Sequence, residues 1–126
     1  MIDIDDFKRI NDTLGHLAGD KVIIYLARLL AKTLRDGDKV FRYGGEEFVV
    51  VLNRIDSDKC MSIAHRLVKL IASSNLIYKE NDIRATVSIG GTLLKDGDDT
   101  SAVLDRADRA LYRAKNSGKN RFEVEI

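Results

Sequence analysis

Residues 39–52 read Lys-Val-Phe-Arg-Tyr-Gly-Gly-Glu-Glu-Phe-Val-Val-Val-Leu, and this stretch decides the fold. Two segments rich in β-formers, Lys39 to Tyr43 and Glu47 to Leu52, flank the pair Gly44-Gly45. A glycine pair adopts the positive φ angles of a tight turn without strain, so the stretch predicts a β-hairpin. Two glutamates, Glu46 and Glu47, follow the turn directly and fall on alternate faces of the second strand, which a turn alone does not explain.

Apolar periodicity predicts the elements on either side of this hairpin. A glycine-free apolar stripe indicates a long helix between a polar turn at Gly15 to Gly19 and the hairpin. The predicted elements are a strand ending at Ile4, a short helix capped by Asp5 or Asp6, a helix over 20–35, the hairpin, a helix starting at Asp56 or Ser57 and ending near Asn75, a strand over 83–94 paired with residues 76–79, a helix capped by Thr100 or Ser101 and stopped by Gly118, and a strand over 121–126. This order favours an α/β sandwich with helices packed on a mixed sheet.

Length and composition restrict the class of protein. The chain has 126 residues, 44% apolar and 33% charged, which predicts one domain with a single modest core. Its net charge of +1 gives no general reason to bind nucleic acid or an anionic membrane, so neither is expected as a partner. The sequence lacks an apolar run of the ~20 residues that span a bilayer, and its start lacks the regions of a signal peptide. The lone Cys60, read as a small buried apolar residue, suits a reducing compartment, so a cytoplasmic location is expected.

Acidic residues gather in two places that the fold could bring together. Asp3, Asp5 and Asp6 lie at the end of the first strand, and Glu46-Glu47 follow the hairpin turn. Magnesium prefers oxygen ligands, usually a few carboxylates together with substrate phosphates, and carboxylates from two adjacent strands would supply them. The alternative is that these acids only cap helices and decorate turns.

Basic and amide residues could complete a nucleotide site. Lys8 follows the acidic strand end, and Lys115 and Lys119 flank the end of the last helix, although each alone reads as a solvated surface lysine. Asn11 and Asp20 bracket the turn that contains His16, and an amide with a carboxylate can read the edge of a purine, favouring guanine over adenine. Taken alone, His16 reads as a hydrogen-bonded structural histidine.

Several spaced motifs resemble the GGDEF domain of diguanylate cyclases. Their number and order make chance resemblance improbable, whereas Gly-Gly-Glu-Glu-Phe alone would be weak. The matching motifs, between Met1 and Asn120, are Asp3-Ile4-Asp5-Asp6-Phe7-Lys8-Arg9-Ile10-Asn11-Asp12, Gly15-His16, Gly19-Asp20, Arg42-Tyr43-Gly44-Gly45-Glu46-Glu47-Phe48, Thr86-Val87-Ser88-Ile89-Gly90, Ala107-Asp108-Arg109-Ala110-Leu111-Tyr112-Arg113-Ala114-Lys115 and Gly118-Lys119-Asn120.

The resemblance implies a fold and a reaction. The fold would be α+β, with a mixed central sheet, a ferredoxin-like βαββαβ core as in nucleotidyl cyclases, and an added hairpin. The reaction would condense two GTP into cyclic di-GMP and release two pyrophosphates, with one GTP bound by each domain of a homodimer. The cofactor would be Mg²⁺ or Mn²⁺, with two ions per half-site. Cyclases of this kind are usually fused to a sensory domain, in some cases within a membrane-bound protein, so a sensory domain is expected here.

The resemblance also implies residue roles. Asp3, the carbonyl of Ile4 and Glu46 would hold the metal, and Glu47 would help a second ion. The catalytic residues would be Glu46, which deprotonates the 3′-hydroxyl, together with Glu47 and Lys8, which stabilises charge on the phosphates. The substrate-binding residues would be Asn11 and Asp20 at guanine, Phe7, His16, Gly44 and Gly45 near the nucleotide, and Lys115 and Lys119 at the outer phosphates.

A second site is expected beside the hairpin. Arg35 and Asp38 form an Arg-x-x-Asp pair that resembles the family's inhibitory product site, and Arg66 falls where a second arginine is expected. An arginine fork binds phosphate or guanine's acceptor edge, so we expect cyclic di-GMP to inhibit its own synthesis. The alternative is a helix-end arginine beside a turn aspartate.

The family pattern also bears on the start of the chain. It normally begins earlier, with an Asp-x-Leu-Thr-Gly-Leu-x-Asn-Arg helix and the rest of the first strand. Residues 1–126 are therefore expected to form a GGDEF domain without that helix and strand start, with exposed apolar surface and weakened nucleotide binding. A catalytically silent module that binds GTP or cyclic di-GMP to regulate a partner is the second hypothesis, ahead of a dimerisation-only role.

Overall fold

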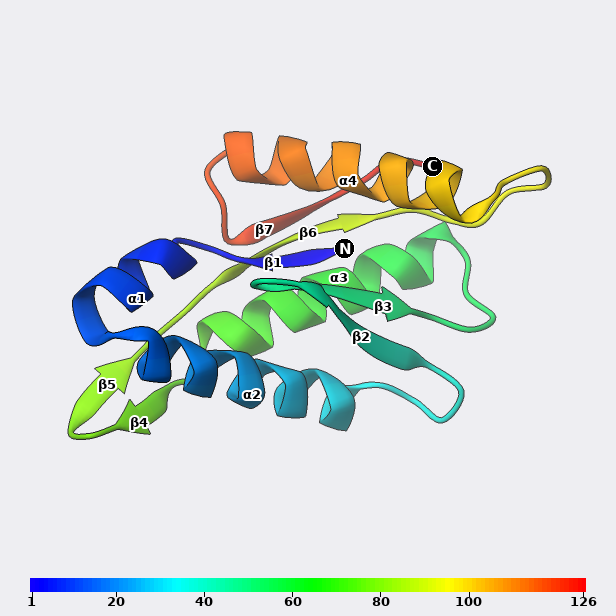
Figure 1. Cartoon of the computed structure of the whole chain (residues 1–126). Coiled ribbons are helices and arrows are strands. Elements are labelled where there is room, and N and C mark those ends of the chain that lie inside the picture. Colours follow the sequence, from blue (N-terminus) through cyan, green and yellow to red (C-terminus); the bar gives the residue numbers. More distant parts are fainter.

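The computed structural model describes all 126 residues. The elements along the chain are β1 (Ile2–Ile4), α1 (Phe7–Leu14), α2 (His16–Thr33), β2 (Lys39–Gly44), β3 (Glu47–Val51), α3 (Ser57–Ala72), β4 (Leu76–Tyr78), β5 (Asn81–Ile83), β6 (Val87–Gly91), α4 (Thr100–Asn116) and β7 (Arg121–Val124) (Figure 1). The hairpin predicted around Gly44-Gly45 is confirmed as β2 and β3, with an irregular register between Arg42 and Gly44.

A five-stranded sheet in the order β2-β3-β1-β6-β7 forms the centre of the molecule. All neighbours are antiparallel except β6 and β7, which α4 connects as parallel strands. Without β7, the connection β1-α2-β2-β3-α3-β6 has the strand order of a ferredoxin-like βαββαβ core, so the predicted fold class is confirmed. The strands β4 and β5 form a separate two-stranded hairpin.

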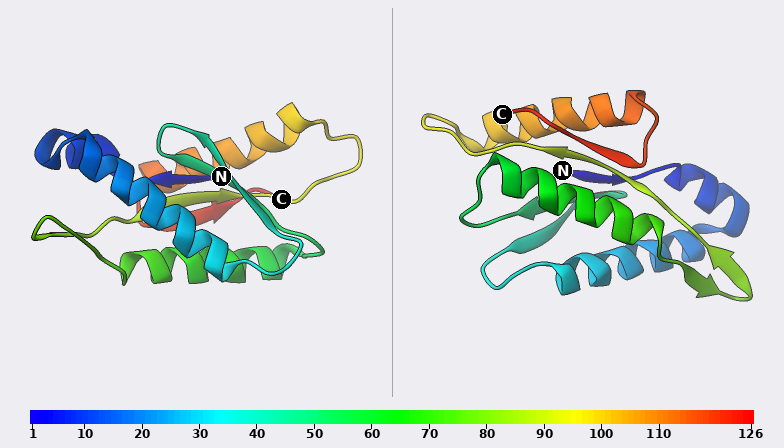
Figure 2. Two further views of the ribbon diagram at one scale, coloured as in Figure 1. Left: turned by 60° about the horizontal axis from the view of Figure 1, so that its bottom comes forward. Right: turned by 180° about the vertical axis from the view of Figure 1, so that it is seen from behind.

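Helices cover both faces of the sheet (Figure 2). Neighbouring glycines of β6 show this: a Cβ on Gly90 would meet the backbone of Ala107 and Leu111 in α4, whereas one on Gly91 would meet Cys60 of α3. Successive residues of a strand point to opposite faces, so α4 lies on one face and α3 on the other. On the α3 face, side chains of β1, β3, β6, α2 and α3 form one hydrophobic cluster. The site described below lies at the edge of this cluster, where β1 ends.

Two predictions about helix starts are wrong, and a third is confirmed only in position. The helix α2 begins at His16 rather than Asp20, because Gly15 alone, with φ of 93°, makes the turn after α1. The cap of α4 is Asp99, which accepts a hydrogen bond from the Ala102 amide, and not Thr100 or Ser101. Asp6 does stand at the start of α1 but makes no capping bond.

The single strand predicted over 83–94 is also wrong, although its predicted pairing with residues 76–79 is confirmed at Ile83, which lies opposite Leu76. It is divided into β5, which pairs only with β4, and β6, which enters the central sheet. Residues 84–86 connect the two without strand structure, because the chain there leaves the small hairpin to reach β1. At the end of this connection the Thr86 carbonyl accepts a hydrogen bond from the Asp5 amide at 2.9 Å.

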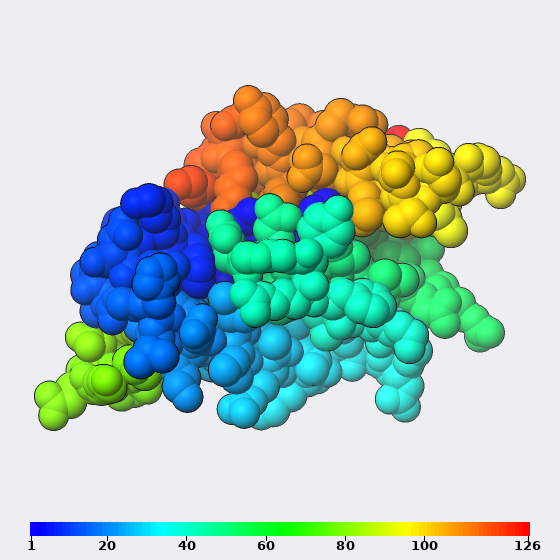
Figure 3. All heavy atoms as spheres, in the orientation of Figure 1, coloured from blue at the N-terminus to red at the C-terminus, as the bar shows by residue number.

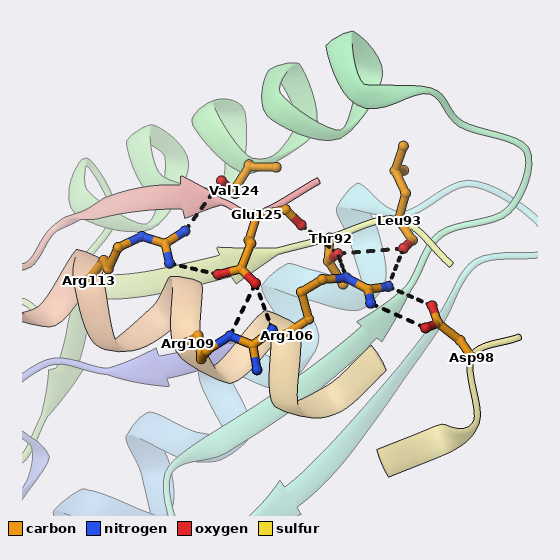
Figure 4. Close-up of polar contacts among 8 residues, drawn as sticks. All are labelled: Thr92, Leu93, Asp98, Arg106, Arg109, Arg113, Val124 and Glu125. Carbon is orange, nitrogen blue, oxygen red and sulfur yellow. Dashed lines mark hydrogen bonds and ion pairs between the residues drawn. The ribbon is translucent and has the colours of Figure 1, made fainter. Parts of the chain in front are cut away.

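Arginines of α4 fix the connection that precedes it and the end of β7 (Figure 4). The Arg106 guanidinium donates to Asp98 at 2.6 Å, to the Leu93 carbonyl at 2.7 Å and to Thr92 Oγ1 at 2.7 Å. Arg109 and Arg113 both donate to the Glu125 carboxylate, at 2.7 and 2.8 Å. These bonds bind α4 to the edge of the sheet and so set the position of its last turn, which carries Lys115.

Candidate functional site

Carboxylates gather where β1 ends beside the β2–β3 turn. Asp3 of β1 lies opposite Glu47 of β3 in the ladder, and the Ile4 amide donates to the Glu46 carbonyl at 3.2 Å. The structure thus brings the first strand end and the two glutamates of the turn together, because β1 and β3 are neighbours in the sheet. In Figure 3 the N-terminal segment, the β2–β3 turn and the end of α4 meet on one face of the molecule.

The pKa values of the carboxyl groups of Asp3 and Glu47 are raised. Burial raises the pKa of Asp3, and repulsion by Glu46 acts in the same direction, although Lys115 lowers it. Burial also raises the pKa of Glu47, and the nearby Asp3 carboxylate adds to the effect. A cation at this point would relieve both, and oxygen donors of this kind are those that Mg²⁺ prefers. No group of three His, Cys, Asp or Glu side chains converges as a complete metal site, so an ion here would also need water or substrate oxygens.

Lys115 supplies the positive charge that the structure contains here. Its Nζ lies 2.8 Å from Asp5 Oδ1, 3.1 Å from Asp3 Oδ1 and 3.5 Å from the Ile4 carbonyl oxygen. Burial opposes the charge on Lys115, but the bonds to Asp5 and Asp3 outweigh it and raise its pKa. The ammonium group therefore occupies oxygens of Asp3 and Ile4, which were predicted to hold a metal.

Asp5 has a structural role that its sequence context did not predict. Its buried carboxylate accepts hydrogen bonds from Lys115, from Thr86 Oγ1 and Ser88 Oγ at 2.7 Å each, and from the Asn120 amide at 2.9 Å. Burial opposes ionisation, but these hydrogen bonds lower the pKa of Asp5 below its usual value. The sequence held one signal: Thr86 and Ser88 are hydroxyl residues at alternate positions of an apolar strand, which indicates a buried polar partner on that face.

The other two lysines are each paired with a carboxylate. Lys119 Nζ lies 2.7 Å from Asp6 Oδ1, so this ion pair joins the turn after α4 to the start of α1. Lys8 Nζ lies 2.6 Å from Asp12, and both side chains are exposed on α1. The structure therefore brings Lys119 to the end of β1, but it does not bring Lys8 to the carboxylates of Asp3 and Glu47.

The residues expected at guanine lie where α1 packs on α2. Asn11 packs so closely on Gly19 that a Cβ on Gly19 would collide with the Asn11 Oδ1 atom, and Phe7 lies against the same point. Asp20 follows Gly19 and is exposed, as is His16 in the first turn of α2. The structure thus places the Asn11 side chain against Gly19, which directly precedes Asp20 in the chain.

The glycines of the β2–β3 turn leave open space. A Cβ on Gly44 or Gly45 would meet nothing within 4 Å, and Gly45 has φ of 46°. The Arg42 guanidinium holds the turn through bonds of 2.9 and 3.1 Å to the Gly45 carbonyl. A ligand could approach the backbone here, as the sequence analysis expected of the glycine pair.

Residues 1–121 match the family described as "Diguanylate cyclase, GGDEF domain". The chain belongs to the GGDEF domain family. It is 42% identical over 125 residues to diguanylate cyclase A of Treponema denticola, and the match covers 98% of this chain but 34% of that protein. The chain therefore spans about a third of the length of this relative.

Solved GGDEF structures share the fold. The GGDEF domain of DgcB from Caulobacter crescentus in complex with c-di-GMP superposes with a TM-score of 0.91 at 35% identity, over 98% of this chain and 74% of that one. The active GGEEF domain of a diguanylate cyclase from Vibrio cholerae superposes with a TM-score of 0.88 at 33% identity, over 99% and 80% of the two chains.

Two residues of the expected inhibitory site of this GGDEF domain, Arg35 and Asp38, contact each other. Arg35 Nε lies 3.2 Å from Asp38, and the same guanidinium donates to the Asn53 carbonyl at 2.6 Å. Burial opposes ionisation of Asp38, but the Asn53 amide and Arg35 lower its pKa. Arg66, on the exposed side of α3, makes no hydrogen bond or ion pair with Arg35 or Asp38. The structure brings the Arg-x-x-Asp pair together, and Arg66 remains an expected member of this site.

An apolar cavity of about 530 Å³ lies at the opposite end of β1 in the GGDEF domain. The amino group of Met1 borders it and donates to the Gly90 carbonyl at 2.7 Å, and burial lowers the pKa of this amino group to about 6. Cys60, predicted as a small buried residue, also lines the cavity, and burial raises the pKa of its thiol.

None of the helices combines the length and apolar character needed to cross a membrane.

Proposed function

We propose that this GGDEF domain condenses two GTP into cyclic di-GMP and releases two pyrophosphates. The observation that carries the proposal is the meeting of Asp3, the Ile4 carbonyl and the Glu46-Glu47 pair where the central strand β1 ends, with raised pKa values for Asp3 and Glu47. Such oxygens hold the divalent ions on which nucleotidyl transfer depends. The c-di-GMP complex of the DgcB GGDEF domain supports the same ligand class.

The proposed metal residues fit Mg²⁺ or Mn²⁺ by the chemistry of their donors. Asp3, the Ile4 carbonyl and Glu46 would hold one ion, and Glu47 would help a second. When bound, such ions neutralise phosphate charge and make the 3′-hydroxyl easier to ionise.

In the proposed reaction, Glu46 accepts the proton of the 3′-hydroxyl. The 3′-oxygen then forms a bond to the α-phosphorus of the second GTP, and the bond from this phosphorus to the pyrophosphate oxygen breaks. Each domain holds one nucleotide, so two domains must face each other as a homodimer. The chain needs no nucleophilic side chain, because positioning and charge neutralisation drive transfer of this kind.

Other residues would orient the nucleotide. Asn11 and Asp20 would bind the guanine edge, beside Phe7 and His16, and the open turn at Gly44-Gly45 would admit the nucleotide to the backbone. Lys8 and Lys119 would bind phosphates after leaving Asp12 and Asp6, and Lys115 would do so after leaving Asp3. A cytoplasmic location, with a sensory domain on the same protein, would suit a signalling enzyme that consumes GTP.

Product formation from GTP and Mg²⁺, measured against protein concentration, tests the proposal. We expect cyclic di-GMP, at a specific rate that rises with concentration as dimers form. Glu46→Gln should lower the rate on the order of 100-fold or more, as loss of a general base does. The exposed Glu80→Gln serves as the matched control. Binding of GTP without product at every concentration would instead support a silent binding module.

Feedback inhibition has its own test. Arg35→Ala should weaken inhibition by cyclic di-GMP and leave the initial rate unchanged, because Arg35 lies in the α2–β2 connection rather than at the carboxylates. The exposed Arg28→Ala is the control. Unchanged inhibition and unchanged product binding in Arg35→Ala would refute an inhibitory site at Arg35 and Asp38.

A further inference from the structure

The Lys115 ammonium and the proposed metal compete for the same oxygens. Lys115 Nζ is bonded to Asp3 Oδ1 at 3.1 Å and reaches the Ile4 carbonyl at 3.5 Å. A magnesium ion on these oxygens would lie about 2.1 Å from each of them, so the two cations would stand a few ångströms apart and repel each other. One of them must leave.

We propose that Lys115 is an internal cation that occupies the Asp3 and Ile4 oxygens before a metal arrives, and that Asp5 is the positioning residue that keeps Lys115 beside the site when a metal displaces it. This inference rests on the proposed function for the identity of the metal ligands. It adds that metal binding and triphosphate binding are coupled through the position of one side chain.

Asp5 is suited to this role because its other bonds are fixed. Thr86 and Ser88 belong to β6 and its approach, and the third donor is the backbone amide of Asn120. The Asp5 side chain is 2% exposed, whereas that of Lys115 is 24% exposed. The carboxylate therefore stays in place, while the long lysine side chain can turn about its end and keep its 2.8 Å contact with Asp5 Oδ1.

The coupling follows from what Lys115 gains when it moves. A metal that binds alone must break the Lys115–Asp3 ion pair and gives the ammonium no new partner. A metal that arrives with a triphosphate gives it phosphate oxygens in exchange. Each ligand should therefore bind more tightly in the presence of the other, by the same factor for both.

Lys119 provides a matched control. It carries the same charge, follows Lys115 by four residues and is paired with a carboxylate at the same strand end, Asp6, at 2.7 Å. It makes no contact with Asp3 or the Ile4 carbonyl, so Lys119→Met removes a nearby positive charge without vacating those oxygens. Any difference between Lys115→Met and Lys119→Met therefore measures the direct competition.

The experiment is a titration of the nucleotide-free protein with Mn²⁺, in which free Mn²⁺ is measured by electron paramagnetic resonance. We expect Lys115→Met to bind Mn²⁺ about tenfold or more tightly than the unchanged protein, which is a change of about 1.4 kcal/mol, and Lys119→Met to change affinity less than threefold. A non-hydrolysable GTP analogue should tighten Mn²⁺ binding in the unchanged protein and do so less in Lys115→Met. Equal Mn²⁺ affinities for the two lysine variants would overturn the inference.

Two further variants guard against misfolding and against a wrong site. Lys115→Met leaves Asp5 buried without its ion partner and could therefore destabilise the fold. The double variant Asp5→Asn/Lys115→Met removes both charges and should also bind Mn²⁺ more tightly than the unchanged protein. A folded double variant with no increase in Mn²⁺ affinity would count against the inference. Asp3→Asn should abolish Mn²⁺ binding if the ligands are correctly placed. Unchanged Mn²⁺ binding in Asp3→Asn, together with no product from GTP in the unchanged protein, would refute the proposed function itself. Loss of Mn²⁺ binding in Asp3→Asn, together with equal Mn²⁺ affinities for Lys115→Met and Lys119→Met, would refute the Lys115 inference alone.

Discussion

Asp3 and Glu47 face each other across the β1–β3 ladder, and the folded protein raises the pKa of both carboxyl groups. Like charges directly opposite each other in a sheet destabilise it. The fold therefore bears an electrostatic cost at the same point where the proposed function needs a cation. Two variants at this site and two elsewhere in the fold give measurable consequences.

Glu47→Gln should stabilise the metal-free protein at pH 7, by up to about 1 kcal/mol. A carboxyl with a raised pKa binds its proton more tightly when folded, so its unfavourable contribution appears as the pH rises above the ordinary value of 4.5. The gain should therefore shrink between pH 7 and pH 4, which urea unfolding at the two pH values measures. Equal or lower stability at pH 7 would contradict this account, and Glu80→Gln is the control.

Asp5→Ala should destabilise the protein by about 3 kcal/mol, because it breaks a buried ion pair and leaves the two hydroxyl donors unsatisfied. The lowered pKa of Asp5 means that its stabilising contribution is present above pH 3.8 and is lost as the pH falls below that value. Asp12→Ala, which removes an exposed ion pair with Lys8, should cost less than about 0.5 kcal/mol. Similar unfolding free energies for the two variants would show that Asp5 is not the centre of this network.

Gly19→Ala should weaken GTP binding about tenfold while changing stability little. The new Cβ would collide with Asn11 Oδ1 and turn the amide away, and an unmade hydrogen bond at a polar edge costs about 1–3 kcal/mol. Calorimetric titration with GTP and with ATP would measure both affinity and selectivity. In the Asn11→Ala background the collision with Asn11 is absent and only the close contact with the Phe7 ring remains, so Gly19→Ala should then have a much smaller further effect on GTP affinity. A full effect in that background would mean that Gly19 acts without Asn11.

Arg106→Lys should lower the melting temperature by several degrees. Lysine cannot reproduce the fork that binds Asp98, Leu93 and Thr92 together. Since this arginine lowers the pKa of Asp98 from 3.8 to about 2, the difference between the two proteins should persist from pH 7 to about pH 4, decrease as the pH falls below 3.8, and be lost near pH 2. Calorimetry across this pH range measures the melting temperatures, with the exposed Arg28→Lys as control. Identical melting curves for Arg106→Lys and the unchanged protein would contradict the prediction.

The parts of the structure that local sequence determines were predictable. Gly44-Gly45 between β-formers predicted the hairpin, and the apolar periods predicted four helices, of which α2, α3 and α4 bury their apolar faces and α1 buries its face only in part. The meeting of Asp3 with Glu47 could also be expected, since the two residues end and begin neighbouring strands.

The rest depends on contacts between distant segments. Asp5 binds groups 81 to 115 residues away along the chain. The residues next to Asp5 do not indicate whether it caps a helix or forms a buried hydrogen-bonded carboxylate at the end of a strand. Periodicity likewise places Lys115 in the last turn of α4 but does not name its acceptors. The division of residues 83–94 into two strands follows from the path to β1, which the alternating pattern does not contain.

The distance along the chain between Asp5 and Lys115 has a consequence for biosynthesis. The two residues are 110 positions apart, and β1 sits in the middle of a sheet whose neighbours are made later. Contacts of such separation form late, because a large loop must close before they reward it. The nucleotide site proposed at the end of β1 therefore cannot form in a nascent chain until α4 and the turn after it have left the ribosome. Its contacts are complete only when synthesis has passed Asn120.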